Sequence, residues 1–308
     1  MVDPLAEIVT LLQPQAPFSK IARASGAWRV RRTEVGQVYY GLMTFGSARL
    51  EVDGKPAFIL RQGDFVLIPA IKDFTMSSLD PPPPAGLIST PVMQADRSVR
   101  IGSPDAPVEV EQLIGYCRFG SPDASLLVSL LPDIVIVRGE SRLGILAKLV
   151  AEEAHASRPA RDVVLARLLE VLLIEAFRSS GERPAGPGVL RGMGDDRLVM
   201  ALRCMHADPA RAWTIAELAR EAGLSRSTFF TRFQREVGRP PMDYLTDWRI
   251  TLAKDLLRRG RSLAEVTRRI GYGSTSAFSV AFSRHVGLPP AQYAGQLPDA
   301  GQLRGPAD

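Results

Sequence analysis

The sequence predicts an α+β protein of two domains: an antiparallel β-barrel with flanking helices, followed by an all-α domain with two helix-turn-helix units. Three observations predict this fold class. Apolar and polar residues alternate between 35 and 70, apolar residues recur at steps of three and four between 141 and 178, and the segment 214–293 contains an internal repeat. A chain of 308 residues can form a hydrophobic core in each of two domains.

Short strands are expected in the first domain. Residues 38–43 are mostly apolar, and residues 48–52 alternate strictly, which places Arg49 and Glu51 on the face opposite their apolar neighbours. Asp53 and Gly54 then supply a turn that favours a tight hairpin. Two further strands are expected at residues 57–60 and 65–68. Strands this short and closely spaced are typical of a small antiparallel barrel or sandwich.

Two amphipathic helices are expected over residues 141–178, with a break at 157–159 that contains Pro159. The second helix, 162–178, carries more apolar surface than one barrel needs to cover its sheet. Two interpretations remain open: both helices cover their own barrel, or the second also forms a homodimer contact.

A stretch rich in Gly, Pro and Ser interrupts the apolar periodicity near residue 180 and predicts a linker. The expected organisation is a sensor and dimerisation domain, a linker, a helical domain and a flexible tail. Their boundaries are 1–180, 181–196, 197–295 and 296–308.

The internal repeat predicts two similar helical units. Thr214 and Glu217 match Ser262 and Glu265 at an offset of 48, and each pair has the spacing of a capping box at a helix start. The parallel continues through pairs of equivalent glycines, phenylalanines and prolines: Gly223 with Gly271, Phe229 with Phe278, Phe233 with Phe282, and Pro240-Pro241 with Pro289-Pro290.

Each copy has the features of a helix-turn-helix, over 214–236 and 262–285. A short helix ends at a glycine, and a second helix starts near Ser225 or Ser274. Between the copies, residues 242–259 form one expected helix, with Pro241 at its start. The side chains expected to hold the units at a fixed separation are Tyr244, Leu245, Trp248, Leu252 and Leu256. A separation of about 34 Å would place the second helices in successive major grooves of B-DNA.

Charge is unevenly distributed. Residues 1–194 contain 21 Lys and Arg and 21 Asp and Glu, whereas residues 195–294 contain 16 basic and 10 acidic residues. The net positive charge of the chain therefore coincides with the repeat, as expected of a module that meets a polyanion.

Composition excludes several other classes. The longest uncharged run, 81–95, has 15 residues and cannot span a bilayer, so no membrane association is expected. The acidic residues Asp3 and Glu7 near the N-terminus are unlike a signal peptide and predict a cytoplasmic protein. Cys117 and Cys204 are interpreted as reduced packing residues.

Residues 197–295 resemble the DNA-binding domain of the AraC/XylS family of bacterial transcription regulators, through Gly271-Tyr272, the two Phe pairs and the ending 287–293. Upstream, residues 38–69 and the segment 115–120 resemble the cupin-type sensor domain of one AraC subgroup. The resemblance covers most of the chain. It implies a cupin-like barrel and a sequence-specific DNA-binding transcription regulator.

The resemblance also implies which residues contact DNA. Base-reading positions fall on Ser227, Phe230 and Thr231 in the first unit and on Thr275, Ser276 and Val280 in the second. Ser276 and Ser279 are expected to contact phosphate or base edges, and Arg226, Arg235 and Arg284 to bind phosphate. The chain departs from the family pattern at Val280, where Arg is usual, and at Ser283, where Lys or Arg is usual. Val280 suits a thymine methyl group rather than guanine.

A rival interpretation is a metal-dependent cupin enzyme fused to a helical domain. Such a site needs two or three histidines converging inside the barrel, but His155, His206 and His285 all lie outside the barrel segment. His155 is expected on a helix surface, His206 as a capping or packing group, and His285 near phosphate. No catalytic residue, metal ligand or cofactor is therefore expected. A third class, an architectural DNA binder without a sensor role, would bend DNA with little sequence preference.

The expected partners are promoter DNA, a second copy of the chain and an unidentified small-molecule effector bound in the barrel. RNA polymerase is a further candidate. The sequence leaves open whether the aromatic residues Tyr39, Tyr40, Phe58 and Phe65 line a pocket or form a packed core, and the core is the preferred interpretation.

Overall fold

The computed structural model describes residues 3–33, 37–70, 73–121, 124–128, 131–139, 141–156, 158–179 and 188–295. It divides into two compact units, one of Leu5–Arg191 and one of Gly192–Asp308 with Met1–Pro4. The predicted tail and residues 181–187 of the predicted linker lie outside the described residues. The remainder of that linker contains a short helix, α5 (Val189–Met193). In the described part of the chain, no helix has the length and apolarity needed to cross a membrane.

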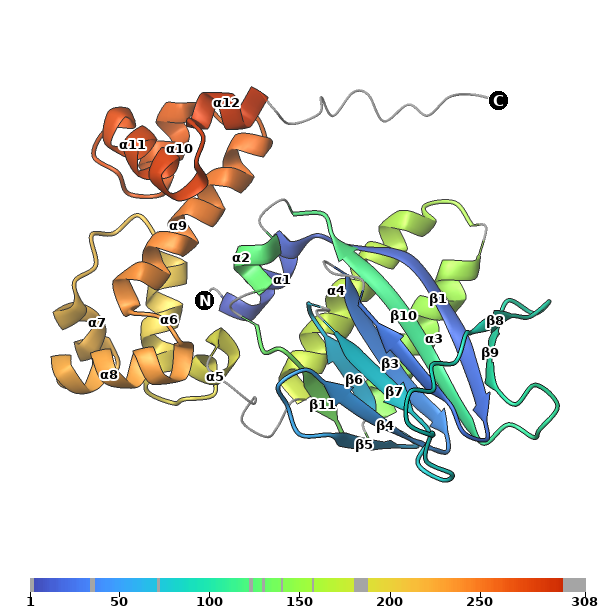
Figure 1. Cartoon of the computed structure of the whole chain (residues 1–308). Coiled ribbons are helices and arrows are strands. Elements are labelled where there is room, and N and C mark those ends of the chain that lie inside the picture. Colours follow the sequence, from blue (N-terminus) through green and yellow to red (C-terminus); the bar gives the residue numbers. More distant parts are fainter. Residues whose placement is uncertain are drawn as a thin grey trace. The chain divides into compact units, whose positions relative to one another are not determined.

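The first unit is built on two β-sheets (Figure 1). The larger sheet has the strand order β11-β6-β3-β10-β1-β9-β8, and the smaller has the order β2-β7-β4-β5. The strands are β1 (Pro14–Ser25), β2 (Arg29–Arg32), β3 (Val38–Phe45), β4 (Ser47–Val52), β5 (Phe58–Arg61), β6 (Phe65–Ile68), β7 (Phe74–Ser77), β8 (Val92–Met93), β9 (Val99–Gly102), β10 (Val110–Phe119) and β11 (Val135–Val137). Among the described pairs, β1 and β9 run parallel and the others antiparallel.

The expected alternation in β4 is confirmed. Ala48 and Leu50 are buried, whereas Arg49 is exposed and donates a hydrogen bond to Glu51 at 2.7 Å. The turn at Gly54 also forms, with φ +72°, but pairing with β5 begins only at Phe58. The loop is therefore longer than the tight hairpin that Asp-Gly predicts.

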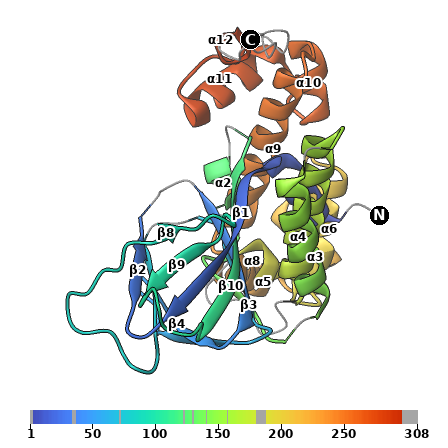
Figure 2. The same cartoon turned by 90° about the vertical axis from the view of Figure 1, so that its right-hand side faces the viewer.

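Two helices pack on the larger sheet. These are α3 (Ser141–His155) and α4 (Arg161–Ser179), and both contact β1. They lie side by side in Figure 2 and match the two predicted amphipathic helices. Two short helices, α1 (Pro4–Leu12) and α2 (Ala124–Val128), complete the described helices of this part of the chain.

The second unit is helical throughout its described elements. The helices are α6 (Leu198–Ala207), α7 (Ile215–Glu221), α8 (Arg226–Val237), α9 (Pro241–Arg258), α10 (Leu263–Arg269), α11 (Thr275–Val286) and α12 (Pro290–Gly295). Helix α9 runs from α7 and α8 to α10 and α11, as Figure 1 shows. The predicted order of helices around a central connecting helix is confirmed, and α6 is an additional helix that periodicity did not predict.

Candidate nucleic-acid interface and barrel pocket

The first helix-turn-helix starts at a reciprocal cap. The Thr214 hydroxyl accepts a hydrogen bond from the Glu217 amide at 3.2 Å, and the Glu217 carboxylate accepts one from the Thr214 amide at 2.9 Å. Helix α7 ends before Gly223, which has φ +62°. Ser225 then caps α8 by accepting from the Thr228 amide at 3.3 Å. Four polar residues and one left-handed glycine thus fix where both helices begin and end.

The second unit repeats this plan with one difference. The Ser262 hydroxyl accepts from the Glu265 amide at 3.2 Å, but the Glu265 carboxylate pairs with Arg269 at 2.8 Å. The expected reciprocal capping box is therefore wrong for this unit, because an arginine one helical turn later competes for the carboxylate. Ser274 caps α11 by accepting from the Ala277 amide at 3.1 Å.

Each second helix is anchored by two buried phenylalanines. The ring centroids lie 5.5 Å apart for Phe229 and Phe233 and 5.4 Å apart for Phe278 and Phe282. Helix α9 supplies Tyr244, Leu245 and Trp248 to the core of the first unit and Ile250, Ala253 and Leu257 to that of the second. Leu252 and Leu256, predicted to hold the units together, are partly buried against the second core. One helix therefore carries both recognition helices.

His206 is a packing residue, as expected. It is 3% exposed, its Nε2 lies 2.7 Å from the Tyr244 hydroxyl, and its ring lies 4.1 Å from that of Trp248. The exposed His155 and His285 each place Nδ1 near a carbonyl of the preceding helical turn. Among the described residues, no group of three potential metal ligands occurs.

A loop of the first unit joins the second unit through α9. Arg249 of α9 donates to the Pro209 carbonyl at 2.6 Å and to the Arg211 carbonyl at 2.7 Å. Between these two residues, the Ala210 carbonyl lies so close to Gly271 that any Cβ at position 271 would overlap it. Burial lowers the pKa of Arg249 from its ordinary value. This clamp fixes the two units relative to each other through backbone contacts, which motif spacing could not predict.

The structure exposes all five residues predicted for DNA contact in the first unit: Arg226, Ser227, Phe230, Thr231 and Arg235. Arg235, however, forms an ion pair at 2.7 Å with the neighbouring Glu236, whose side chain is 4% exposed. It therefore has a structural role besides the one that its position predicts. Arg226 stands at the exposed start of α8, where backbone amides also favour phosphate.

In the second unit, Thr275, Ser276, Val280 and Arg284 are exposed, and Val280 is 72% exposed. Ser279 is half-buried, and its hydroxyl donates to the Thr275 carbonyl at 2.7 Å. In this rotamer the Ser279 hydroxyl can only accept a hydrogen bond from DNA. Phosphate oxygens also only accept, so a base-edge contact suits Ser279 better than the predicted phosphate contact.

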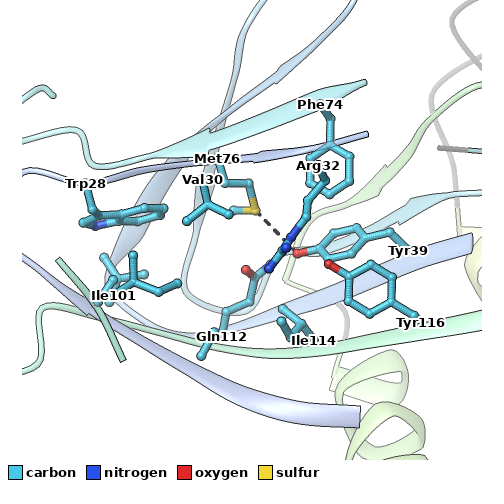
Figure 3. Close-up of a pocket in the computed structure, with 13 residues that line it drawn as sticks. Trp28, Val30, Arg32, Tyr39, Phe74, Met76, Ile101, Gln112, Ile114 and Tyr116 are labelled. Carbon is cyan, nitrogen blue, oxygen red and sulfur yellow. Dashed lines mark hydrogen bonds between the residues drawn. The ribbon is translucent and has the colours of Figure 1, made fainter. Parts of the chain in front are cut away.

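The barrel contains a pocket between its two sheets (Figure 3). It is lined by Ala22, Ala24, Trp28, Val30, Arg32, Tyr39, Phe74, Met76, Ile101, Val110, Gln112, Ile114 and Tyr116. Of the four aromatic residues left open by the sequence, Tyr39 lines the pocket. Tyr40 and Phe65 are fully buried, and Phe58 packs against the core. Burial raises the pKa of Tyr40, and its hydroxyl lies 2.6 Å from that of Ser19.

Sequence reasoning missed the polar residues of this pocket, although a signal for them exists. Arg32 follows Trp28 and Val30 at steps of two, and Gln112 stands between Val110 and Ile114 in the same way. A polar residue at an inward position of an alternating strand is a candidate ligand contact.

Two family profiles match the chain. The family described as Cupin matches residues 3–182, and the one described as Helix-turn-helix domain matches residues 218–296. A putative AraC-like transcription regulator of Streptomyces lividans is 38% identical, covering 95% of this chain and 98% of the relative. One of Streptomyces antibioticus is 35% identical, with the same coverage of both chains. The crystal structure of ToxT from Vibrio cholerae O395 covers 93% of this chain and 99% of that one at 14% identity and a TM-score of 0.37, a similarity too low to carry weight.

Proposed function

The chain belongs to the family of AraC-like transcription regulators, and from this premise we propose that it binds promoter DNA through the exposed faces of α8 and α11. The observation that carries the proposal is the pair of capped recognition helices held by one shared helix, α9, and by the Arg249 clamp. Helices fixed in this way can enter successive major grooves without first ordering themselves. The family also makes the chain a regulator rather than the metal-dependent cupin enzyme of the rival interpretation.

The exposed residues suggest a division of roles. Arg226, Arg235 and Arg284 bind phosphate and fix the register of the protein on DNA. The base-reading side chains are Ser227, Phe230 and Thr231 on α8 and Thr275, Ser276, Ser279 and Val280 on α11.

Fluorescence anisotropy with the full chain tests this proposal. Labelled DNA from upstream of its own gene and of the neighbouring genes is titrated at physiological salt, with random duplex as competitor. We expect at least a hundredfold preference for one fragment, because specific sites exceed non-specific DNA by roughly 10³–10⁷. Equal affinity for every duplex would overturn the proposal, and DNA bending without preference would favour an architectural role instead.

The barrel is the proposed site of a small-molecule effector. Its pocket is lined mainly by apolar side chains with a few polar groups, as ligand sites usually are. An effector would act by binding more tightly to one of two states of the regulator, which differ in DNA affinity. The matching control is DNA affinity measured with a variant whose pocket is filled, such as Ala24→Leu, in the presence and absence of effector.

We also propose a homodimer formed through α3 and α4. Five large aliphatic side chains on these helices are at least 41% exposed: Ile145, Leu149, Val163, Val164 and Val171. Sedimentation velocity of the full chain should give a dimer, and Val164→Glu with Val171→Glu should shift it to monomer. Val92→Glu, at an equally exposed valine of β8, is the control and should leave the dimer intact. A monomeric parent chain would refute this part. RNA polymerase and a cytoplasmic location stay predictions.

A further inference from the structure

The barrel pocket has chemically distinct ends. Figure 3 shows the Arg32 guanidinium, the Gln112 amide and the hydroxyls of Tyr39 and Tyr116 gathered toward one end, with Trp28 and Ile101 toward the other. No Asp or Glu is among the described residues that line it. The polar end therefore offers hydrogen-bond donors and positive charge without a carboxylate to neutralise them.

The strongest sign of a ligand contact is Gln112. The residue is 5% exposed, and its amide nitrogen has no hydrogen-bond partner among the described residues. This nitrogen lies close to the Tyr39 hydroxyl without hydrogen-bond geometry, in space that Gly41 leaves free because it lacks a Cβ. A buried donor without a partner costs about 1–3 kcal/mol, so a ligand acceptor placed there gains that amount of stabilisation.

Tyr39 adds a second donor. Burial raises the pKa of its hydroxyl above the usual value, so the group stays protonated. Its described acceptor is the Met76 sulfur at 3.4 Å, which is a weak one. An oxygen acceptor would displace the sulfur with a gain in hydrogen-bond energy.

Two cations lie near the same end. Arg32 lines the pocket, and Lys20 stands on the face of β1 that carries Ala22 and Ala24. Burial, and then the positive charge of Arg32, lower the pKa of Lys20. Both cations also have interactions elsewhere in the chain. An anion beside them would nonetheless reduce their mutual repulsion.

The opposite end and the size of the pocket limit the rest of the ligand. Trp28, Val30, Met76 and Ile101 present apolar surface. The cavity volume is about 40 Å³. An ordered water needs roughly 10–15 Å³ on that measure, so there is space for about three waters. A short aliphatic chain or one ring fits this space better than a sugar or a long lipid chain.

We propose that the pocket binds a small carboxylate with an apolar body, the carboxylate facing Arg32 and Gln112 and the body facing Trp28 and Ile101. This inference rests on the proposed function, in which the barrel is the effector site. A carboxylate is preferred because its oxygens only accept hydrogen bonds and carry the charge that the two cations require.

Isothermal titration calorimetry with the full chain tests the ligand class. Hexanoate and benzoate are the probes, and hexanamide and benzamide are neutral controls of nearly the same shape. We expect each acid to bind at least tenfold more tightly than its amide. Equal affinities, or no measurable binding of either acid at millimolar concentration, would overturn the inference.

Variants then place the binding in the barrel. Arg32→Gln should abolish the preference for acid over amide, and Gln112→Leu should weaken acid binding at least threefold. Arg31→Gln is the matched control, since Arg31 lies on the same strand but is exposed and pairs with Asp73. Unchanged affinity in Arg32→Gln would refute the inference. If that variant fails to fold by circular dichroism, Gln112→Leu and the acid–amide comparison decide.

The DNA measurement separates this inference from the proposed function. A protein that prefers one promoter but binds neither acid refutes only the ligand class. A protein that binds the acids but prefers no DNA refutes the regulator. Acid binding that changes promoter affinity at least threefold would support both.

Discussion

The two helix-turn-helix units share a scaffold but differ in the surface they present. Both second helices start at a serine cap and end before a left-handed glycine, Gly238 with φ +84° and Gly287 with φ +81°. Yet α8 carries three arginines, whereas α11 carries one arginine and exposes Val280 by 72%. The folding determinants have been kept in both copies while the exposed residues diverged.

This difference indicates two modes of DNA contact. The first unit can neutralise several phosphates and hold the protein on any duplex, which gives salt-dependent affinity. The second unit, with small hydroxyl and apolar side chains, allows a close approach to base edges and methyl groups. The first unit would thus supply most of the affinity, and the second a larger share of the selectivity.

The largest expected contrast concerns the turn glycines. Gly271→Ala introduces a Cβ that overlaps the Ala210 carbonyl, in addition to the unfavourable φ of +79°, whereas at Gly223 the new Cβ would meet only the flexible end of Arg197. We expect a loss of about 3 kcal/mol or more for Gly271→Ala and about 1 kcal/mol for Gly223→Ala. Urea unfolding of the full chain measures both. Equal losses would show that the clamp is not rigid.

The second contrast concerns phosphate binding. Arg226→Ala should weaken binding to all sequences about tenfold and reduce the salt slope by about one. Arg167→Ala, which removes an exposed arginine of α4, is the control for net charge and should leave DNA affinity unchanged. Arg235→Ala is a less clean test, because it also removes a partner of the buried Glu236. A loss confined to one DNA sequence would assign Arg226 to base reading instead.

The third contrast concerns base reading. Val280→Ala should reduce discrimination at one thymine position by about 1 kcal/mol, because it removes apolar contact with a methyl group. Thr231→Ala should alter preference at a different base step. Binding to a library of single-base variants of the promoter site would locate both. If Val280→Ala weakens all variants equally, α11 does not read bases through this residue.

The parts of the fold that local chemistry determines were predictable from the sequence. Caps at Thr214, Ser225 and Ser274, the left-handed glycines and the paired phenylalanines each act within a few residues, so their spacing fixes the helices. The exposed DNA-contact residues follow from the same periodicity. The alternation of β4 shows that sheets are equally readable where one face is buried.

The rest depends on contacts between distant segments. The Ala210 contact with Gly271, the pairing of β1 with β10 and the convergence of Arg32 with Gln112 join residues 60 or more positions apart, and no local pattern specifies them. Competition between partners was also unpredictable, because two acceptable partners for one carboxylate differ only in geometry, as Glu265 shows.

The smallest contrast is the pH dependence of the two caps. Hydrogen bonds from Arg211 and from the Thr214 backbone lower the pKa of Glu217 to about 2, from an ordinary value of 4.5. Because the folded-state pKa is the lower one, the stabilisation is fully present above about pH 4.5 and is lost as the pH falls toward 2. Glu217→Gln should therefore flatten the acid limb of the stability curve, measured by thermal unfolding between pH 2 and 6. Glu265→Gln is the matched variant in the second unit, where the reciprocal cap is not formed, and should change that limb less. A larger effect at Glu265 would mean that its pair with Arg269 matters more than the capping box of the first unit.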